Sequence, residues 1–231
     1  MGLRLLAVTY DAPDPAPPAR FWAGLLGREI VEDADGLLLP GSDTQAGLRF
    51  VASDTAKVAR DRIHLHVTSD GAAGQDETVA TALSLGGRHL DVGQLPEEGH
   101  IVLADPAGNE LCVIEPGNRY LAGCGPLGEL ACDGTRAVGL FWSAALGWPL
   151  VWDQDEETAI QSPAGGTKVA WGGPPVAPRT GRDRQRLELV ADRQTEIDRL
   201  VTLGATRLGT GGDGTILLAD PDGNEFRVRK S

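Results

Sequence analysis

The chain has 231 residues, a formal net charge of −12, 41% hydrophobic residues and 23% charged residues. This length suits one larger domain or two small modules that share a core. The acidic balance argues against a general nucleic-acid binder, because contact with phosphates needs a positive surface, and no apolar run approaches the ~20 residues that a membrane span requires.

Three cysteines, Cys112, Cys124 and Cys132, are an odd number and lack the spacing of zinc ligands. The N-terminal residues run directly into a strand pattern and do not have the pattern of a signal peptide. We therefore expect reduced thiols in a cytoplasmic protein.

In chain order, residues 3–11 read as a strand, and Asp14 followed by Pro15 is typical of the start of a helix. This helix should end at Gly27, because glycine readily adopts the left-handed conformation that closes a helix. Short strands are predicted next, around residues 30–31, 37–39 and 48–51.

Residues 62–67 alternate strictly between polar and apolar side chains, which predicts a half-buried strand. A second helix is predicted over residues 76–85 and should end at the two glycines that follow. A strand, a tight turn and another strand then complete this half of the chain at residue 114. The turn reads Asp-Pro-x-Gly-Asn, which combines residues that fix or permit turn conformations with side chains that bond nearby backbone.

The same order of elements restarts near residue 127, and two sequence signatures occur twice. The strand and turn of residues 103–110 recur in residues 218–225 with seven of eight positions identical, and the helix of residues 21–27 recurs in residues 141–147. Repetition of this kind indicates a duplicated module. We predict a first module over residues 1–115, a linker over residues 116–126 and a second module over residues 127–231.

A strand, an Asp-Pro helix start, a Phe-Trp helix ending in Leu-Gly, a middle strand and a terminal Leu-Ala-Asp-Pro-x-Gly-Asn-Glu together resemble the glyoxalase, bleomycin-resistance and extradiol-dioxygenase group, the vicinal oxygen chelate superfamily. The resemblance covers residues 3–115 and 127–229 and is strongest to duplicated glyoxalase-like domain proteins. It implies an α+β fold of two tandem glyoxalase-like modules. Each module would be built from paired βαβββ units that form a curled sheet around a cleft.

Metal enzymes of this superfamily hold a divalent ion in the cleft, and the resemblance implies where the ligands would stand. The corresponding positions are Ala7, His64 and Cys112 in the first module and Leu127, Arg186 and Arg227 in the second. Alanine and leucine offer no ligand atom, and arginine repels a cation. We therefore expect no cofactor, with His64 as the one weak candidate ligand for a divalent metal such as Zn, Fe, Mn or Ni.

Strand alternation places His64 and His66 on the cleft side of their strand. Three interpretations of these histidines stay open: ordinary hydrogen bonding on a half-exposed strand, contact with a bound ligand, or acid–base catalysis. Cys112 should face the same cleft, either as a small buried side chain or as part of a binding site.

In the second module, Arg186, Glu188, Glu225 and Arg227 should point to the same cleft side. One interpretation is a lattice of salt bridges that fills the position of the metal. The other is a binding site for an acidic or polar ligand, because arginine presents a planar fork to carboxylates and phenolates.

The tryptophans of the helices differ in expected role from those of the strands. Trp22 and Trp142 lie on the repeated helices and are predicted to be core residues. Trp152 and Trp171 lie on strands of the second module, where a planar ligand could stack on them.

The leading hypothesis is metal-independent binding of a small organic metabolite, aromatic or acidic, as in sequestration of an antibiotic. The predicted ligand-binding residues are Arg186, Glu188, Arg227, Trp152, Trp171 and Cys112. The alternative is a lyase, isomerase, cyclase or dioxygenase-type enzyme that acts on an oxygen-rich metabolite through His64 and His66, with or without a divalent metal. A third possibility is a structural or regulatory partner protein. We expect a small-molecule partner, no nucleic acid, no membrane, and a monomer or a homodimer.

Overall fold

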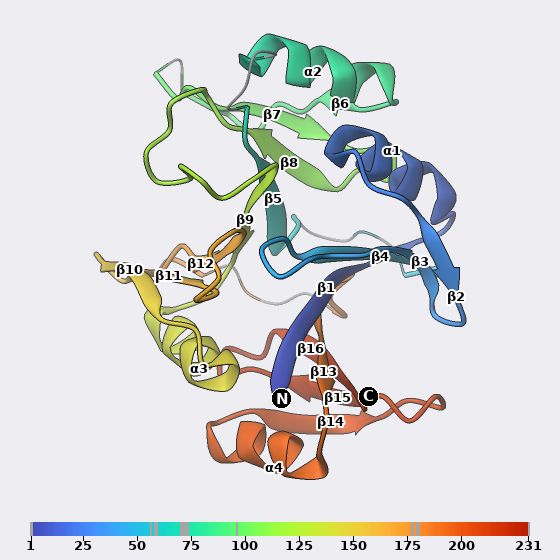
Figure 1. Ribbon diagram of the computed structural model, residues 1–231, viewed down its shortest axis with the longest axis vertical. Helices are drawn as coiled ribbons and strands as arrows, with labels where there is room; N and C mark the ends of the chain where they lie inside the picture. The colour runs from blue at the N-terminus through green and yellow to red at the C-terminus, as the bar shows by residue number, and fades with distance from the viewer. Residues whose placement is uncertain are drawn as a thin grey trace.

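A computed structural model describes residues 2–55, 57, 60–69, 74–95, 97–176, 178 and 181–230. Four units, each with the order strand, helix and three strands, follow one another along the chain (Figure 1). The first unit contains β1 Leu3–Ala12, α1 Ala16–Leu26, β2 Val31–Asp33, β3 Gly36–Leu39 and β4 Gly47–Ala52. The second contains β5 Ile63–Val67, α2 Gly74–Ser84, β6 Arg88–His89, β7 Ile101–Ala104 and β8 Glu110–Val113.

The second half of the chain repeats this order. The third unit contains β9 Leu127–Cys132, α3 Arg136–Leu146, β10 Leu150–Gln154, β11 Glu157–Gln161 and β12 Lys168–Trp171. The fourth contains β13 Gln185–Ala191, α4 Gln194–Thr202, β14 Thr206–Thr210, β15 Ile216–Ala219 and β16 Glu225–Lys230. Within the described part of the chain, no helix is both long and apolar enough to cross a membrane.

The strands form two eight-stranded sheets, and each sheet combines two units. Sheet A has the order β14-β15-β16-β13-β1-β4-β3-β2 and joins the first unit to the fourth, whereas sheet B has the order β10-β11-β12-β9-β5-β8-β7-β6 and joins the second to the third. The predicted α+β architecture of paired βαβββ units is therefore confirmed. Each sheet takes four strands from residues 1–115 and four from residues 127–231, so both sheets cross between the two predicted modules.

The repeated helices end where the sequence predicts. Gly27 closes α1 at φ 63°, and Gly147 closes α3 at φ 67°; both values lie in the left-handed region that glycine adopts without strain. At the start of α1, Asp14 accepts a hydrogen bond from the backbone N–H of Ala16 at 3.0 Å. The two helices have the same length, 11 residues, and carry their Phe-Trp pairs at the same positions.

One hydrophobic core is shared by both sheets. Val8 and Phe226 from sheet A and Leu65 from sheet B belong to the same buried cluster as Trp22 and Trp142. The prediction that these two tryptophans are core residues is confirmed, because their exposed fractions are 0% and 2%. The apolar positions of the alternating strands face this core, and we call the opposite surface of each sheet its cleft face.

The aspartate of the repeated turn accepts a hydrogen bond from the indole N–H of the repeated helix. Asp105 accepts a hydrogen bond from Trp22 Nε1 at 3.0 Å through Oδ2, and the same oxygen accepts Asn109 Nδ2 at 2.8 Å. Its other oxygen accepts the backbone N–H groups of Ala107 and Asn109. Asp220 holds Trp142 Nε1 in the second copy, at 3.3 Å. The two sequence signatures that repeat are thus the two sides of one contact.

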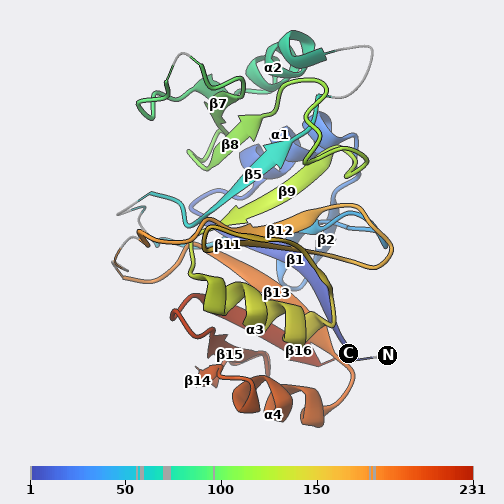
Figure 2. The same ribbon diagram turned by 90° about the vertical axis from the view of Figure 1, so that its left-hand side faces the viewer.

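The segment of residues 116–126 packs against the cleft face of sheet B. Leu121 and Cys124 are buried with Val102 and Cys112 in a small hydrophobic cluster of their own. The hydroxyl of Tyr120 donates to Glu129 on β9 at 2.6 Å. In Figure 2, β5 and β9 of sheet B lie above β1 and β13 of sheet A. One wall of this cleft face is therefore built by the segment between the two halves of the chain.

The Trp22–Asp105 contact generates a stability prediction. Both carboxylate oxygens of Asp105 accept hydrogen bonds, and Asp105→Asn replaces one of them with an amide N–H₂ group, which cannot accept. The donors that faced that oxygen are then buried without a partner, which is costly. We expect the free energy of unfolding to fall by about 3 kcal/mol in chemical denaturation. Asp91→Asn is the control, because Asp91 is exposed and accepts one backbone bond, from Gly93. Equal, small effects of the two substitutions would contradict a structural role for the contact.

Candidate functional site

One row of sheet B carries four polar side chains next to one another. Strand register pairs Lys168 with Glu129, Glu129 with His66, and His66 with Cys112. Residues that pair directly across strands point to the same face of the sheet, so all four lie on the cleft face. Two neighbouring strands from different halves of the chain, β5 and β9, supply the central pair.

The next row on the cleft face has small residues between His64 and Trp152. Register pairs His64 with Ala131, Ala131 with Ala170, Ala170 with Ala159, and Ala159 with Trp152. Methyl groups at three successive positions leave an open space between the imidazole and the indole.

This space is a cavity of about 370 Å³. Its walls include His64, Glu129, Trp152 and Tyr120, together with part of Trp171. Trp152 is 38% exposed and lies with its ring centroid 5.9 Å from that of Tyr120, nearly perpendicular to it. Trp171 is 2% exposed and stacks on Trp142, so it belongs mainly to the core. The cavity volume is in the range of small-molecule sites.

Cys112 and Glu129 together favour the charged form of His66. The Nδ1 atom of His66 lies 2.7 Å from Glu129 Oε2. Burial opposes a charge on His66, but hydrogen bonds to Cys112 and Glu129 outweigh it and raise its pKa to about 9. The pKa of Glu129 is lowered even though burial alone would raise it, because His66 and Tyr120 both donate to it. The pair is therefore ionised at neutral pH.

The pKa of His64 is shifted in the opposite direction. Its ring centroid lies 4.9 Å from that of His66. Burial and the positive charge of His66 lower its pKa to about 4. At neutral pH His64 is a neutral imidazole that faces the cavity beside an imidazolium, so one ring can accept a hydrogen bond while the other carries a charge.

Tyr120 lines the cavity, and Lys168 packs against its ring. Lys168 donates to the backbone oxygen of Tyr120, and its ammonium lies 3.9 Å from the centroid of the Tyr120 ring. Burial and the carboxylate of Glu129 raise the pKa of the Tyr120 hydroxyl, which therefore stays protonated and donates to that carboxylate. Both oxygens of Glu129 are thus engaged, one by His66 and one by Tyr120.

The strand pairing contradicts part of the metal-ligand sets that the family resemblance implies. Ala7 was expected beside His64 and Cys112, but it lies on sheet A, opposite Glu188. This expectation is wrong because the first unit pairs with the fourth and not with the second. Leu127 is fully buried in the core, and Glu129 is the charged residue of β9 that faces the cleft.

On sheet A the corresponding positions are filled by ion pairs. Glu188 is fully buried and accepts bonds at 2.9 Å from both Thr9 Oγ1 and Arg49 Nε, with Arg229 Nε 2.5 Å from its second oxygen. Arg186 is 1% exposed and donates to both oxygens of Asp11. Ion pairs therefore surround Arg186 and Glu188, but their partners are Asp11, Arg49 and Arg229 and not the other members of the predicted lattice.

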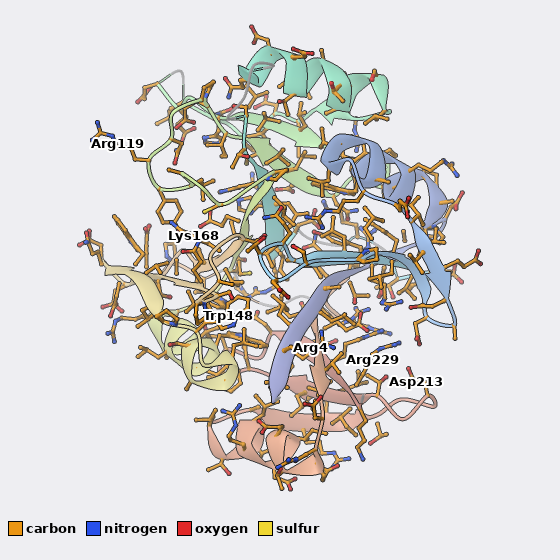
Figure 3. All side chains as sticks on the ribbon, viewed as in Figure 1. Arg4, Arg119, Trp148, Lys168, Asp213 and Arg229 are labelled. Carbon is orange, nitrogen blue, oxygen red and sulfur yellow. The ribbon has the colours of Figure 1, made fainter. Side chains whose placement is uncertain are left out.

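The structure therefore divides the predicted site residues between two faces. His64, His66, Cys112, Trp152 and part of Trp171 lie on or beside the cleft face of sheet B. Arg186, Glu188 and Arg227 lie on sheet A. Figure 3 shows Lys168 and Arg229, one from each sheet, in different parts of the molecule.

Sequence reasoning missed Glu129, Lys168 and Tyr120. A signal existed for Glu129, because it is the charged position of an otherwise apolar strand at residues 127–132. No local pattern marks Tyr120, which lies in a segment rich in glycine and proline.

Among the residues that the structure describes, His64, His66 and Cys112 form a possible metal-ligand set, with ligand atoms within 4.8 Å of one another. Two imidazoles and a thiolate suit a borderline ion such as Zn²⁺, whereas Mg²⁺ or Ca²⁺ prefers oxygen ligands. The carboxylate of Glu129 on His66 Nδ1 is also the outer contact that metal-bound histidines commonly have. The donor chemistry therefore fits zinc, in competition with the proton that His66 carries.

Comparison with known proteins agrees with this fold. Glyoxalase I from Zea mays has a similar structure, with a TM-score of 0.65 at 15% identity over 98% of this chain and 92% of that chain. A putative dioxygenase from Bacillus subtilis has a TM-score of 0.65 at 12% identity over 99% and 85% of the two chains. At such identities the likeness concerns the fold. The family model described as Glyoxalase-like domain matches residues 7–114 and 129–229, and the chain therefore belongs to the glyoxalase-like domain family.

Proposed function

We propose that this protein binds a small, flat organic molecule in the cavity of sheet B, without requiring a metal ion. The observation that carries the proposal is the cavity of about 370 Å³ between His64 and Trp152. An aromatic wall with a few convergent polar groups is the usual composition of a small-molecule site. The three free cysteines support a cytoplasmic location for this activity.

The side chains around the cavity suggest how such a molecule would be held. The half-exposed indole of Trp152 offers a planar face, and the neutral His64 offers a hydrogen bond at the other end. The charge of His66 would favour an electron-rich oxygen of the ligand nearby. A phenol or an aromatic carbonyl compound has this combination of a flat ring and an acceptor oxygen.

A second candidate function, acid–base catalysis on an oxygen-rich metabolite, is favoured by the two histidines. Their pKa values differ by environment, about 4 for His64 and about 9 for His66, so a proton acceptor stands beside a proton donor. Zinc held by His64, His66 and Cys112 would add polarisation of a ligand oxygen. Lyases and isomerases that move a proton next to a carbonyl fit this arrangement.

Trp152→Ala tests the binding proposal. We expect compounds that raise the melting temperature of the native protein, chosen from a screen of flat phenols and aromatic acids, to bind at least about 10-fold more weakly to this variant, because a stacked face and apolar contact are lost. Affinity is measured by calorimetric titration. Trp148→Ala is the matched control, since Trp148 lines a different cavity, with Arg4 and Thr44. Unchanged affinity in Trp152→Ala would reject this cavity as the site.

Metal independence has its own test. Protein dialysed against a chelator is expected to bind the same compounds with unchanged affinity, and so is Cys112→Ser. The contrary result is a stoichiometric divalent ion in the purified protein that is lost in His64→Ala, as measured by elemental analysis. Turnover of a bound compound that disappears in His64→Ala would assign catalysis in place of binding.

The ion pair of His66 predicts a pH dependence. Because its folded-state pKa of about 9 lies above the unfolded value of 6.5, the charge stabilises the fold fully below pH 6.5, and this contribution is lost as the pH rises through about 9. The free energy of unfolding of chelator-treated protein should fall over that range, by about 3 kcal/mol at most.

Nuclear magnetic resonance titration of the imidazoles measures the same effect directly. Glu129→Gln should lower the pKa of His66 towards 6.5, because the neutral amide no longer stabilises the imidazolium. Glu157→Gln is the control, as it removes another carboxylate of the cavity wall that does not touch His66. Equal titration of His66 in wild type and Glu129→Gln would contradict the ion pair.

A further inference from the structure

A second cavity lies where the first unit meets the third, and it shares no lining residue with the cavity of sheet B. Its volume is about 230 Å³. The lining comes from the start of β1, the loop between β3 and β4, the residue that follows the C-terminal glycine of α3, and the turn between β11 and β12. Segments that are far apart in the sequence therefore surround one small space.

Hydrogen bonds between the first and third units fix the walls of this cavity. The N–H of Thr167 donates to the backbone oxygen of Thr44 at 2.8 Å. The hydroxyl of Thr167 accepts the N–H of Ala46 and the side-chain amide of Gln45, both at 3.2 Å. A Cβ atom at Gly166 would overlap the backbone oxygen of Thr44, so glycine is required where the two segments cross. The cavity is therefore formed by the fold itself and does not depend on a ligand to open it.

Two oppositely charged side chains of the lining lack partners. Arg4 on β1 and Asp43 in the loop before β4 are both exposed, and among the described residues neither side chain forms an ion pair or a hydrogen bond. They do not pair with each other either, although both line the same cavity. A guanidinium group binds a carboxylate through two parallel N–H···O bonds, and a carboxylate accepts charge-assisted bonds from an ammonium group. The lining thus offers one place for a carboxylate and a separate place for an amine.

The rest of the lining includes an apolar part. Leu3, Leu5 and Trp148 are half-buried and pack against the hydrophobic core. In Figure 3, Arg4 and Trp148 lie in the same part of the molecule, near the start of β1. Apolar groups of a ligand would leave water in this part of the cavity, which favours binding. A cavity smaller than the ~300 Å³ of usual small-molecule sites suits a small ligand.

We propose that this cavity binds a free α-amino acid with a medium-sized aliphatic side chain. Arg4 binds the α-carboxylate, Asp43 binds the α-ammonium group, and the apolar part of the lining covers the side chain. A molecule with only one of the two charges leaves the other protein group without a partner. This site is separate from the cavity of sheet B and does not depend on the function proposed for it.

L-leucine is the probe, and the indole N–H of Trp148 in ¹⁵N–¹H spectra reports on the site. Titration with leucine should shift this resonance to saturation and leave that of Trp152, in the cavity of sheet B, unchanged. Isocaproate is leucine without the ammonium group, and isoamylamine is leucine without the carboxylate. Each should bind at least about 10-fold more weakly than leucine, because one charge-assisted interaction is lost.

Substitution of either charged residue identifies the ligand group that it binds. In Arg4→Gln the affinity for leucine should fall about 10-fold or more, whereas the affinity for isoamylamine, which has no carboxylate, should not change. In Asp43→Asn the affinity for leucine should fall in the same way, whereas isocaproate, which has no ammonium group, should bind as before. Both residues are exposed, so neither substitution disturbs the core.

Arg119→Gln and Asp91→Asn are the matched controls. Both residues are exposed and line neither of the two cavities, and Arg119 projects away from the body of the protein (Figure 3). These substitutions remove the same charges elsewhere and should leave the affinity for leucine unchanged, as should Trp152→Ala.

Three results would overturn the proposal. The first is no shift of the Trp148 indole resonance with leucine, or an equal affinity for leucine, isocaproate and isoamylamine. The second is an affinity for leucine in Arg4→Gln and Asp43→Asn that equals the affinity in the controls. The third is leucine binding that is lost in Trp152→Ala, which would place the ligand in the cavity of sheet B.

Discussion

The hydrogen bond from a helix indole to the aspartate of the Asp-Pro-x-Gly-Asn turn holds the architecture together. Trp22 of the first unit binds Asp105 of the second, and Trp142 of the third unit binds Asp220 of the fourth. Sheet A joins the first unit to the fourth, and sheet B joins the second to the third. The four units are therefore closed into a ring, in which side-chain contacts alternate with sheet contacts. Because each cleft face is made by one unit from each half of the chain, its geometry depends on these contacts.

The two cleft faces have the same strand pairings and differ in side-chain size. On sheet B, Ala131 and Ala170 follow His64 across the sheet, and the space above them is the cavity. On sheet A the matching positions beside Arg186 are Thr9 and Arg49, whose side chains fill that space and bind Glu188. Larger polar residues at these positions thus make one of two equivalent surfaces an ionic lattice.

Charge is compensated differently on the two faces. On sheet B one carboxylate, Glu129, is shared between an imidazolium and a phenol, and a neutral His64 remains directed at the cavity. On sheet A, Glu188 is shared among Arg49, Arg229 and Thr9, and Arg186 pairs with Asp11. The first arrangement leaves a neutral imidazole beside an open cavity, whereas the second pairs its charges with one another. A duplicated fold can in this way carry two surfaces of different chemistry.

The sequence alone determined the duplication, the βαβββ order, the ends of the repeated helices and the cleft-side orientation of His64 and His66. These features depend on local turn chemistry and on alternation within one strand, which are legible in a single segment. Only the tertiary structure decided which units share a sheet, and that decision placed Glu129 beside His66 and separated Ala7 from His64. Pairing of β5 with β9 and of β1 with β13 is set by the burial of whole sheet faces in one core, and residues far apart in sequence carry no local mark of it. Tyr120 illustrates the same limit, because a residue in a glycine-rich segment became part of the site only when that segment packed across sheet B.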